Sequence, residues 1–463
     1  MSAEPVAVRR TGPARETGGG PSARAVLFSA LLGFVVIALD ASAVNVALPA
    51  IGHSLRGSTA ALQWILDAYT LMFAALLLSA GALSDRIGAN RVFAAGIVAF
   101  TLASVACGVA PGLGMLVAGR LVQGAAAAVI LPSSLALVRQ AFPDPGRRAR
   151  AIALWTVGGA VAVAAGPIAG GLLTSAISWR AIFFINLPVG AVTVLLASRA
   201  SGSPRRAAAL DPFGQLAAVV ALATLTFGVI EGGDHGFGRP TVIGCLIVAA
   251  VATVAFVGIE QHVAEPMVPL ELFRSRTVTV CVLIGFSVNA AFYGVVFLFS
   301  LFFQQIQHQS AVEAGLMFLP MTALIAGANL ASARVAARFG ARVPIAFGQL
   351  ISLLGLLGLL TVDPQTSRPV VALLLIPVGV GLGFAVPSLT AAMLGDIAAD
   401  RAGLAAGVLN SGRQTGGALA VAVFGALIAQ PAPFTRGLHE SLLVAAILLL
   451  ATTVTAMALP RSS

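Results

Sequence analysis

Residues 25–49 read AVLFSALLGFVVIALDASAVNVALP and contain a single charged residue, Asp40. A helix needs about 20 residues to cross the hydrocarbon core of a bilayer, so this stretch is long enough to span it. An acid inside such a run is costly in lipid and marks a paired or functional position. The stretch therefore predicts a first membrane-spanning helix that carries a buried carboxylate.

Thirteen similar apolar segments follow, separated by clusters of Gly, Pro and Arg. The chain is 58% hydrophobic and only 10% charged, whereas soluble proteins are about 25% charged. Within lipid, only helices and closed barrels satisfy their backbone groups, and no ten-residue alternation typical of a barrel is present. We expect an all-α integral membrane fold with fourteen transmembrane helices, at roughly 25–49, 63–83, 92–110, 113–138, 150–173, 181–199, 213–231, 240–259, 277–304, 311–331, 343–362, 369–391, 403–429 and 438–459.

The basic residues predict the orientation in the membrane. All 27 are Arg, and a cytoplasmic N-terminus would place 20 of them on the inner side and five on the outer side. This asymmetry follows the positive-inside rule and predicts that both termini are cytoplasmic. Arginines that punctuate apolar runs do not form the basic face that nucleic-acid binding requires, so we expect no nucleic-acid partner.

The division into domains follows from the polar connections. Residues 1–24 are polar and rich in Gly and Pro, which predicts a disordered cytoplasmic tail. We expect a six-helix bundle over 25–199, two inserted linker helices over 213–259 and a second six-helix bundle over 277–459. A weak internal repeat supports two related halves, because Arg86-Ile-Gly-Ala-Asn is matched by Arg338-Phe-Gly-Ala-Arg. Duplicated halves with a binding site between them are typical of secondary transporters, and such a cavity makes a functional monomer sufficient.

Catalytic and metal-binding patterns are missing from the sequence. Its three cysteines lie in apolar runs, and its five histidines are scattered without an HExxH motif or a His-carboxylate cluster. We therefore expect neither an enzyme nor a metal or cofactor site; a transporter of this kind would use the proton motive force.

Asp40 and Arg120 are the two most informative charges. Counted from the outer ends of their helices at 1.5 Å per residue, they lie about 13 Å and about 10 Å below the outer surface. Charges at matching depth can compensate each other if the helices touch. The pair is either a static structural ion pair or a proton-coupling site, in which Asp40 exchanges its Arg partner for a proton.

Three motifs resemble those of the major facilitator superfamily. Gly81-Ala-Leu-Ser-Asp85-Arg86-Ile-Gly88-Ala-Asn-Arg91 is similar to its signature loop, which implies a conformational latch, although a purely topogenic turn is the alternative. Leu116-Val-Ala-Gly-Arg120 resembles its fourth-helix motif. The third, on the fifth span, resembles its antiporter motif and is otherwise a small-residue packing site; it comprises Gly166, Pro167, Gly170 and Gly171.

Leu39-Asp40-Ala-Ser-Ala-Val-Asn45 is similar to the first-helix motif of the fourteen-span drug:proton antiporters. Within that group the chain resembles actinobacterial antibiotic-resistance exporters of the methylenomycin resistance type. The resemblance implies a multi-pass protein of the cytoplasmic membrane that exports a small amphiphilic drug or antibiotic in exchange for protons. The alternative is a proton-coupled uptake symporter or uniporter of a small nutrient.

Polar and aromatic residues inside the pore-lining segments are the candidates for a substrate cavity. Each is otherwise a hydrogen-bonding contact between helices. Asn410, Arg413 and Gln414 share one helical face by their spacing, and Asp67 could bind a cationic drug or a second proton. The full set is Asp67, Gln123, Asn289, Phe292, Tyr293, Asn410, Arg413 and Gln414.

Overall fold

The computed structural model describes residues 21–199, 203, 211–397, 401–429, 433–457 and 459, and every regular element within them is helical. The predicted tail therefore lies, over residues 1–20, outside the described part of the chain. The first half contains α1 (Pro21–Leu55), α2 (Thr59–Ile87), α3 (Ala89–Gly108), α4 (Leu113–Ala141), α5 (Pro145–Ala176), α6 (Ala181–Phe184) and α7 (Asn186–Ala197). A helix pair follows, α8 (Pro212–His235) and α9 (Pro240–His262).

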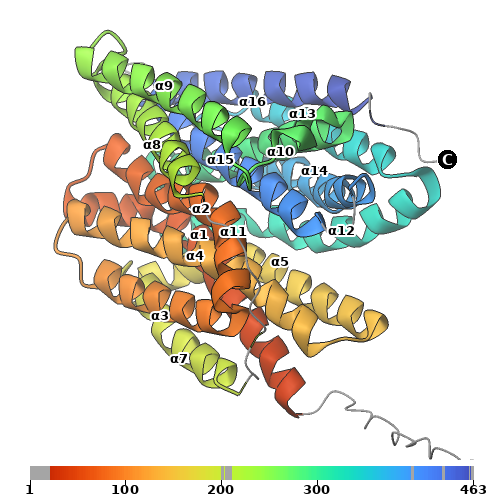
Figure 1. The fold of residues 1–463 in the computed structure, drawn as a ribbon. Coiled ribbons are helices and arrows are strands. Elements are labelled where there is room, and N and C mark those ends of the chain that lie inside the picture. The colour runs from red at the N-terminus through yellow and green to blue at the C-terminus, as the bar shows by residue number, and fades with distance from the viewer. Residues whose placement is uncertain are drawn as a thin grey trace, which may run out of the picture.

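The second half begins with a 3₁₀ turn, η1 (Leu270–Arg274), and contains α10 (Arg276–Leu301), the π-helical turn η2 (Phe302–Ile306), α11 (Ala311–Met317), α12 (Leu319–Phe339), α13 (Arg342–Leu359), α14 (Arg368–Gly395), α15 (Ala402–Ile428) and α16 (Phe434–Ala456). Figure 1 shows the two halves one above the other, with α8 and α9 along the edge between them. Helix α8 contacts both α2 and α15, so the pair bridges the halves.

Two glycine turns show the relation between the halves. Gly88 ends α2 with φ 104°, and Gly340 ends α12 with φ 79°, which are conformations that favour glycine. Each glycine N–H donates to the helix it terminates, to the carbonyl oxygens of Ser84 and Ala336 respectively. The repeat seen between Arg86 and Arg338 thus corresponds to the same turn built twice.

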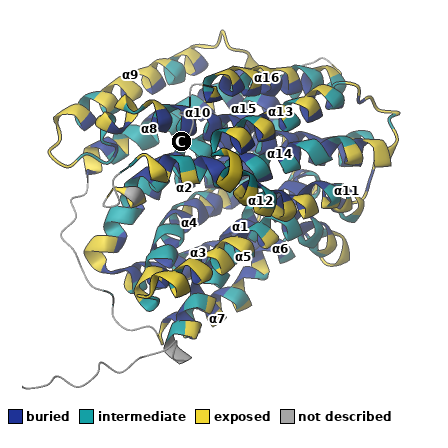
Figure 2. Cartoon of the chain, turned by 90° about the vertical axis from the view of Figure 1, so that its right-hand side faces the viewer, coloured by how far each residue is buried: buried dark blue, intermediate teal, exposed yellow. Residues whose placement is uncertain are grey.

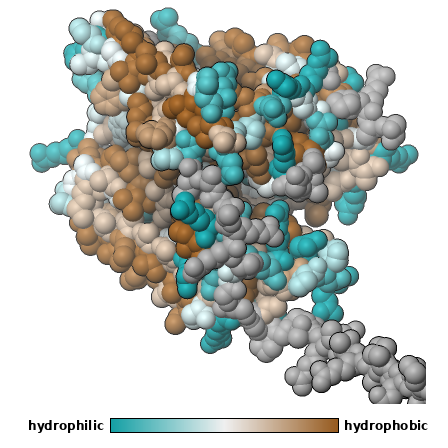
Figure 3. Space-filling model, in the orientation of Figure 1, coloured by the Kyte–Doolittle hydropathy of each residue, from teal (hydrophilic) through white to brown (hydrophobic). Residues whose placement is uncertain are grey.

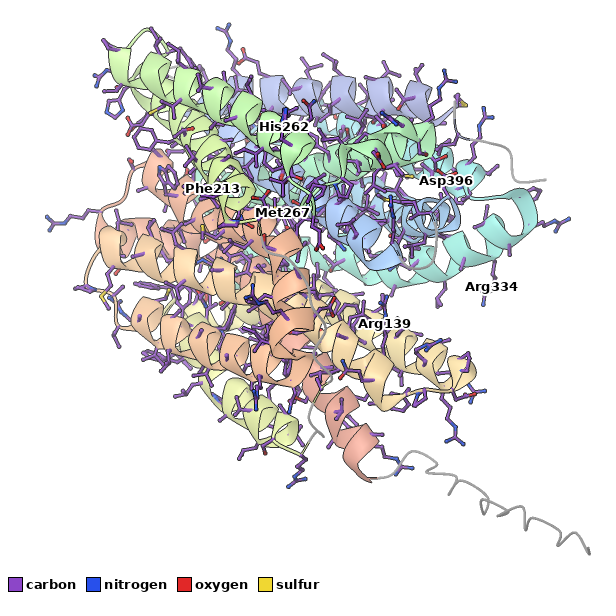
Figure 4. The ribbon with its side chains drawn as sticks, in the orientation of Figure 1. Arg139, Phe213, His262, Met267, Arg334 and Asp396 are labelled. Atoms are coloured by element: carbon purple, nitrogen blue, oxygen red, sulfur yellow. The ribbon has the colours of Figure 1, made fainter. Side chains whose placement is uncertain are left out.

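Polar contacts fix the inserted pair against α2. The Ser79 hydroxyl lies 2.5 Å from the Gln215 side-chain oxygen, and the Gln215 amide donates to the Ala75 carbonyl. Met267, which follows the end of α9 at His262 (Figure 4), places its sulfur 3.0 Å from the Ser79 hydroxyl. These contacts anchor both ends of the α8–α9 unit to the first half.

The outer surface is apolar, as a lipid-facing surface requires. On α9, Val251 and Val254 are 63% and 73% exposed, and Figure 2 shows exposed residues along the outward side of this helix. Hydrophobic surface covers much of both halves in Figure 3. Twelve of the described helices are long and apolar enough to span a membrane, so the chain is a multi-pass membrane protein.

Fourteen spans are expected from the sequence, and twelve helices among the described residues have the length and apolar character that a span requires. The segment Ala181–Ala197, which joins α6 and α7, is apolar but falls just short of the 18 residues required. Helix α15 is long enough, but it is not among the twelve. Its central turns carry Asn410, Arg413 and Gln414, which face the interior and make the helix less apolar.

Candidate functional site

A buried ion pair joins α1 to α4. The Arg120 Nη1 donates to Asp40 Oδ2, and both side chains are almost fully buried. Arg120 also donates from Nε to the Ile65 carbonyl at 3.0 Å and lies over the Tyr69 ring, 4.3 Å from its centroid. The contact expected from matched depth is therefore present, and α2 supplies two further contacts that hold the guanidinium in place.

Two further side chains, Asn186 and Gln123, donate hydrogen bonds to the Asp40 carboxylate. Asn186 Nδ2 donates to Asp40 Oδ1 at 2.9 Å and to the Ser104 hydroxyl at 2.8 Å. Gln123 Nε2 donates to the same Asp40 oxygen at 3.3 Å, and its Oε1 accepts from Arg120 at 3.0 Å. A low-dielectric interior makes such charge-assisted contacts strong. The resulting network connects α1, α3, α4 and α7.

Asn186 and Ser104 were not among the predicted site residues. Asn186 is the one strongly polar side chain in the run Ala181-Ile-Phe-Phe-Ile-Asn-Leu-Pro188, so the sequence did contain a signal. Ser104 carries no such signal because a buried serine often bonds only to its own helix.

A central cavity of about 150 Å³ lies between the halves. Residues from α1, α2, α4 and α5 line one side, and residues from α10 and α15 line the other. Its aromatic walls are Phe34, Tyr69, Phe73 and Tyr293. Its polar lining consists of Asn45, Thr70, Arg120, Asn410, Arg413 and Gln414. The combination suits a ligand with an apolar body and a few polar groups.

Four of the eight predicted cavity residues line this space: Tyr293, Asn410, Arg413 and Gln414. The other four do not. Gln123 belongs to the Asp40 network, Asn289 lies behind Arg413, and Phe292 packs edge-on against Tyr293 with ring centroids 5.4 Å apart.

Asp67 lies on another face of α2. It is fully buried, and neither carboxylate oxygen has a hydrogen-bond partner within the described part of the chain. Helical spacing puts it on the face of Trp64, which contacts Phe227 on α8, and of Leu71, which borders Thr226 on α8. The same spacing sets it beside Gln63, whose amide donates to the Val421 and Ala422 carbonyls of α15. Asp67 therefore lies on the side of α2 that meets α8 and α15, and it is not among the residues that line the central cavity.

The glycine motif on α5 is a close-packing surface. A Cβ atom built on Gly166 would lie 1.8 Å from the Ser42 hydroxyl, and one on Gly170 would lie 2.4 Å from the Ala43 carbonyl oxygen. On the other side, a Cβ on Gly171 would lie 2.4 Å from the Ala311 carbonyl oxygen. The motif thus lets α5 approach α1 in its own half and α11 in the other half at backbone distance. Pro167 lies inside α5, where its carbonyl oxygen is 2.4 Å from a Cβ built on Gly315.

The turn between α2 and α3 is at the opposite end of α2 from its Ser58 cap. Asp85, Arg86 and Arg91 are exposed there, and none of their side chains forms a hydrogen bond or ion pair with the described residues. A Cβ on Gly81 would meet nothing within 4 Å. Figure 4 shows Arg139 from α4 and Arg334 from α12 at this end of the two halves.

The family model of the Major Facilitator Superfamily matches residues 30–421. The chain belongs to the Major Facilitator Superfamily. This membership confirms the resemblance seen in the motifs and the prediction of a transporter rather than an enzyme.

Two relatives of this superfamily member are named as resistance proteins. The Methylenomycin A resistance protein of Streptomyces coelicolor is 37% identical over 412 residues, covering 89% of this chain and 87% of the relative. The Tetracenomycin C resistance and export protein of Streptomyces glaucescens is 33% identical, covering 87% of this chain and 75% of the relative. Both are similar over nearly the whole described length.

The solved structures support the fold. A bacterial homolog of the human lysosomal transporter Spinster aligns with a TM-score of 0.67 over 96% of this chain and 100% of its own. Its sequence identity is 15%, so it shows that the Major Facilitator Superfamily fold is shared and nothing about substrate.

Proposed function

We propose that this protein exports an amphiphilic drug or antibiotic across the cytoplasmic membrane in exchange for protons. The observation that carries the proposal is the buried Asp40–Arg120 pair, whose guanidinium borders the central cavity between the two halves. The similar Streptomyces proteins are named for resistance and for export, and these names favour export of the substrate over nutrient uptake.

Proton coupling at Asp40 follows from its contacts. The carboxylate is stabilised by Arg120, Asn186 and Gln123, and loss of these donors favours the neutral acid in a buried position. A conformational change that separates α1 from α4 would therefore load a proton onto Asp40, and re-pairing with Arg120 would release it. The exchange needs no metal or cofactor, because the proton motive force supplies the energy.

Alternating access follows from where the halves touch. Helix α5 meets α11 at backbone distance at the end where α1 finishes, whereas at the other end the side chains of the latch residues Asp85 and Arg86 have no partner among the described residues. We therefore place the closed end outside and the α2–α3 turn inside, with both termini cytoplasmic. In this arrangement, α6–α7 and α15 complete fourteen spans in a six-plus-two-plus-six order that functions as a monomer.

The cavity is smaller than the ~300 Å³ of a usual small-molecule pocket. Binding of a drug-sized substrate consequently requires the halves to separate further at the open end. The Thr322 hydroxyl of α12 reaches the Ala164 carbonyl of α5 at 3.4 Å, and this single weak contact is one that such a movement would break.

Inverted membrane vesicles that contain the protein test the proposal. A pH gradient, acid inside, is formed first, and methylenomycin A or tetracenomycin C is then added outside. An antiporter dissipates the gradient on addition of a substrate, whereas a symporter does not, because its substrate would have to move inward together with protons. A separate measurement in whole cells establishes that the protein reduces accumulation of the compound. If the pH gradient in the vesicles persists when that compound is added, proton exchange is refuted.

A further inference from the structure

Among the described residues that line the central cavity, one cationic side chain has no acidic partner. Arg120 and Arg413 are the charged residues among those that line it, and Arg120 is neutralised by Asp40. Arg413, in contrast, donates from Nε to Asn289 Oδ1 at 3.2 Å and from Nη1 to Asn410 Oδ1 at 3.1 Å. Both acceptors are neutral amides, so the positive charge of Arg413 is uncompensated.

An uncompensated guanidinium in the membrane interior is costly and is normally paired. Of its five N–H donors, the two contacts above use two, and the Nη2 atom has no acceptor among the described residues. Arg413 is only half-buried because it faces the cavity. The donors left over point to an acceptor that enters the cavity from outside the protein.

We infer that the transported molecule carries an anionic oxygen group, such as a carboxylate, phenolate or enolate, that binds Arg413. This inference rests on the proposed function, since it assigns the substrate class of the same cavity. A planar guanidinium binds a carboxylate through two parallel hydrogen bonds, which an ammonium cannot do. The aromatic walls formed by Tyr69, Phe73 and Tyr293 would hold the apolar body of the ligand.

The charges around the cavity exclude the opposite ligand class. With Asp40 paired, the lining carries a net charge of +1 from Arg413, and protonation of Asp40 raises it to +2 by freeing Arg120. A lipophilic cation is repelled in both states. Because a proton on Asp40 and an anion on Arg413 attract each other, their exchange depends on alternate opening of the halves rather than on direct displacement.

The membrane potential adds to this selectivity. An anion that leaves a cell with a negative interior moves down the electrical gradient, which contributes about 2.3 kcal/mol per charge for each 100 mV. Export of an anion in exchange for a proton therefore draws on both components of the proton motive force.

Three naphthalene probes of equal size test the inference with the full-length protein in lipid nanodiscs. They are naphthalene-1-carboxylate, the neutral naphthalene-1-carboxamide and the cationic 1-naphthylmethylammonium, and the measurement is the Kd of each by naphthalene fluorescence. We expect the carboxylate to bind roughly tenfold or more tightly than the other two, as charged hydrogen bonds generally allow. Equal binding of the three, preference for the cation, or no binding by any of them would overturn the inference.

Two variants locate the effect. Arg413→Gln removes the charge, and Asn289→Asp keeps Arg413 but gives it an acidic partner of the same shape at the 3.2 Å contact. In both variants the carboxylate should lose its advantage, so that the ratio of the carboxylate and carboxamide Kd values falls to about one. Should Arg413→Gln fail to fold, Asn289→Asp alone decides; a carboxylate preference that survives in it would overturn the assignment. The Asp40→Asn variant separates this result from the proposed function, because it should keep the charge preference while losing proton exchange.

Discussion

Arg120 donates to Asp40 and also lines the central cavity, whereas Asp40 lies behind it and does not reach the cavity. Any proton that reaches Asp40 from the cavity therefore has to pass the guanidinium. Because the Arg120 guanidinium lies between the cavity and the Asp40 carboxylate, separation of the ion pair is the step that gives protons access to Asp40. The substitutions below test that relationship and the packing that accompanies it.

Asp40→Asn should abolish gradient-driven efflux but retain substrate binding, because the amide fits the site and cannot exchange a proton. Asp40→Glu should retain partial coupling since a titratable group survives. The measurement is substrate-dependent proton release from proteoliposomes. If Asp40→Asn couples as well as the wild type, the proton site lies elsewhere, and Asp67 is the next candidate because it is fully buried without a partner.

Arg120→Lys should transport far less than conservation of charge suggests. Lysine cannot donate simultaneously to Asp40, Gln123 and the Ile65 carbonyl in the fixed geometry of the guanidinium, and it loses planar stacking on Tyr69. We expect at least a tenfold lower efflux rate, equivalent to about 1.4 kcal/mol in the barrier. Arg276→Lys at the start of α10 serves as the matched control. An equal efflux rate in both variants would contradict a role for the planar guanidinium of Arg120.

Asn186→Leu should lower the efflux rate, although Asn186 was not among the site residues predicted from the sequence. The change removes donors to Asp40 and Ser104 and leaves a buried carboxylate less well solvated, at a cost of about 1–3 kcal/mol. The rate of efflux is measured against pH. A residue that positions the acid should change the shape of this profile, while a uniform reduction at every pH would show a purely structural contribution.

Gly170→Ala should impair transport, because its Cβ would lie 2.4 Å from the Ala43 carbonyl oxygen. Overpacking of this kind costs typically about 1–3 kcal/mol and would push α5 away from α1. Gly146→Ala, on the same helix but with its nearest neighbour at 3.5 Å, is the control. Comparable efflux and proton leak in the two variants would mean that the close approach is dispensable.

Asp85→Asn should reduce transport while expression and topology stay intact, since the Arg count that sets orientation is unchanged. The exposed carboxylate forms no hydrogen bond or ion pair with the described residues, so its contribution is expected in the state where the inner end is closed. Accessibility of a cysteine introduced at Ala41, a cavity-lining residue of α1, reports the balance of states. The latch hypothesis fails if this accessibility and the transport rate both match those of wild type.

The sequence by itself determined the all-helical membrane fold, the family and the level of Asp40 with Arg120. These follow from properties that are local: apolar length, the breaks between segments, and the rise of a helix per residue. Local composition also explains why twelve of the fourteen expected segments are long and apolar enough to qualify as spans. Helix α15 is less apolar because its polar residues face a cavity, and a count of apolar runs cannot see which way a side chain points.

Only the tertiary structure decided which polar residues belong together. Asn186 meets Asp40 across 146 positions of chain, and Arg413 meets Asn289 across 124, through helix contacts that no local pattern encodes. The same holds for Asp67, which was expected in the cavity and instead lies on the side of α2 that meets α8 and α15. Helix rotation decides these outcomes, because a turn of 100° per residue sends neighbouring polar residues to different partners, and the rotation is set by packing between glycines and backbone such as Gly170 and Ala43.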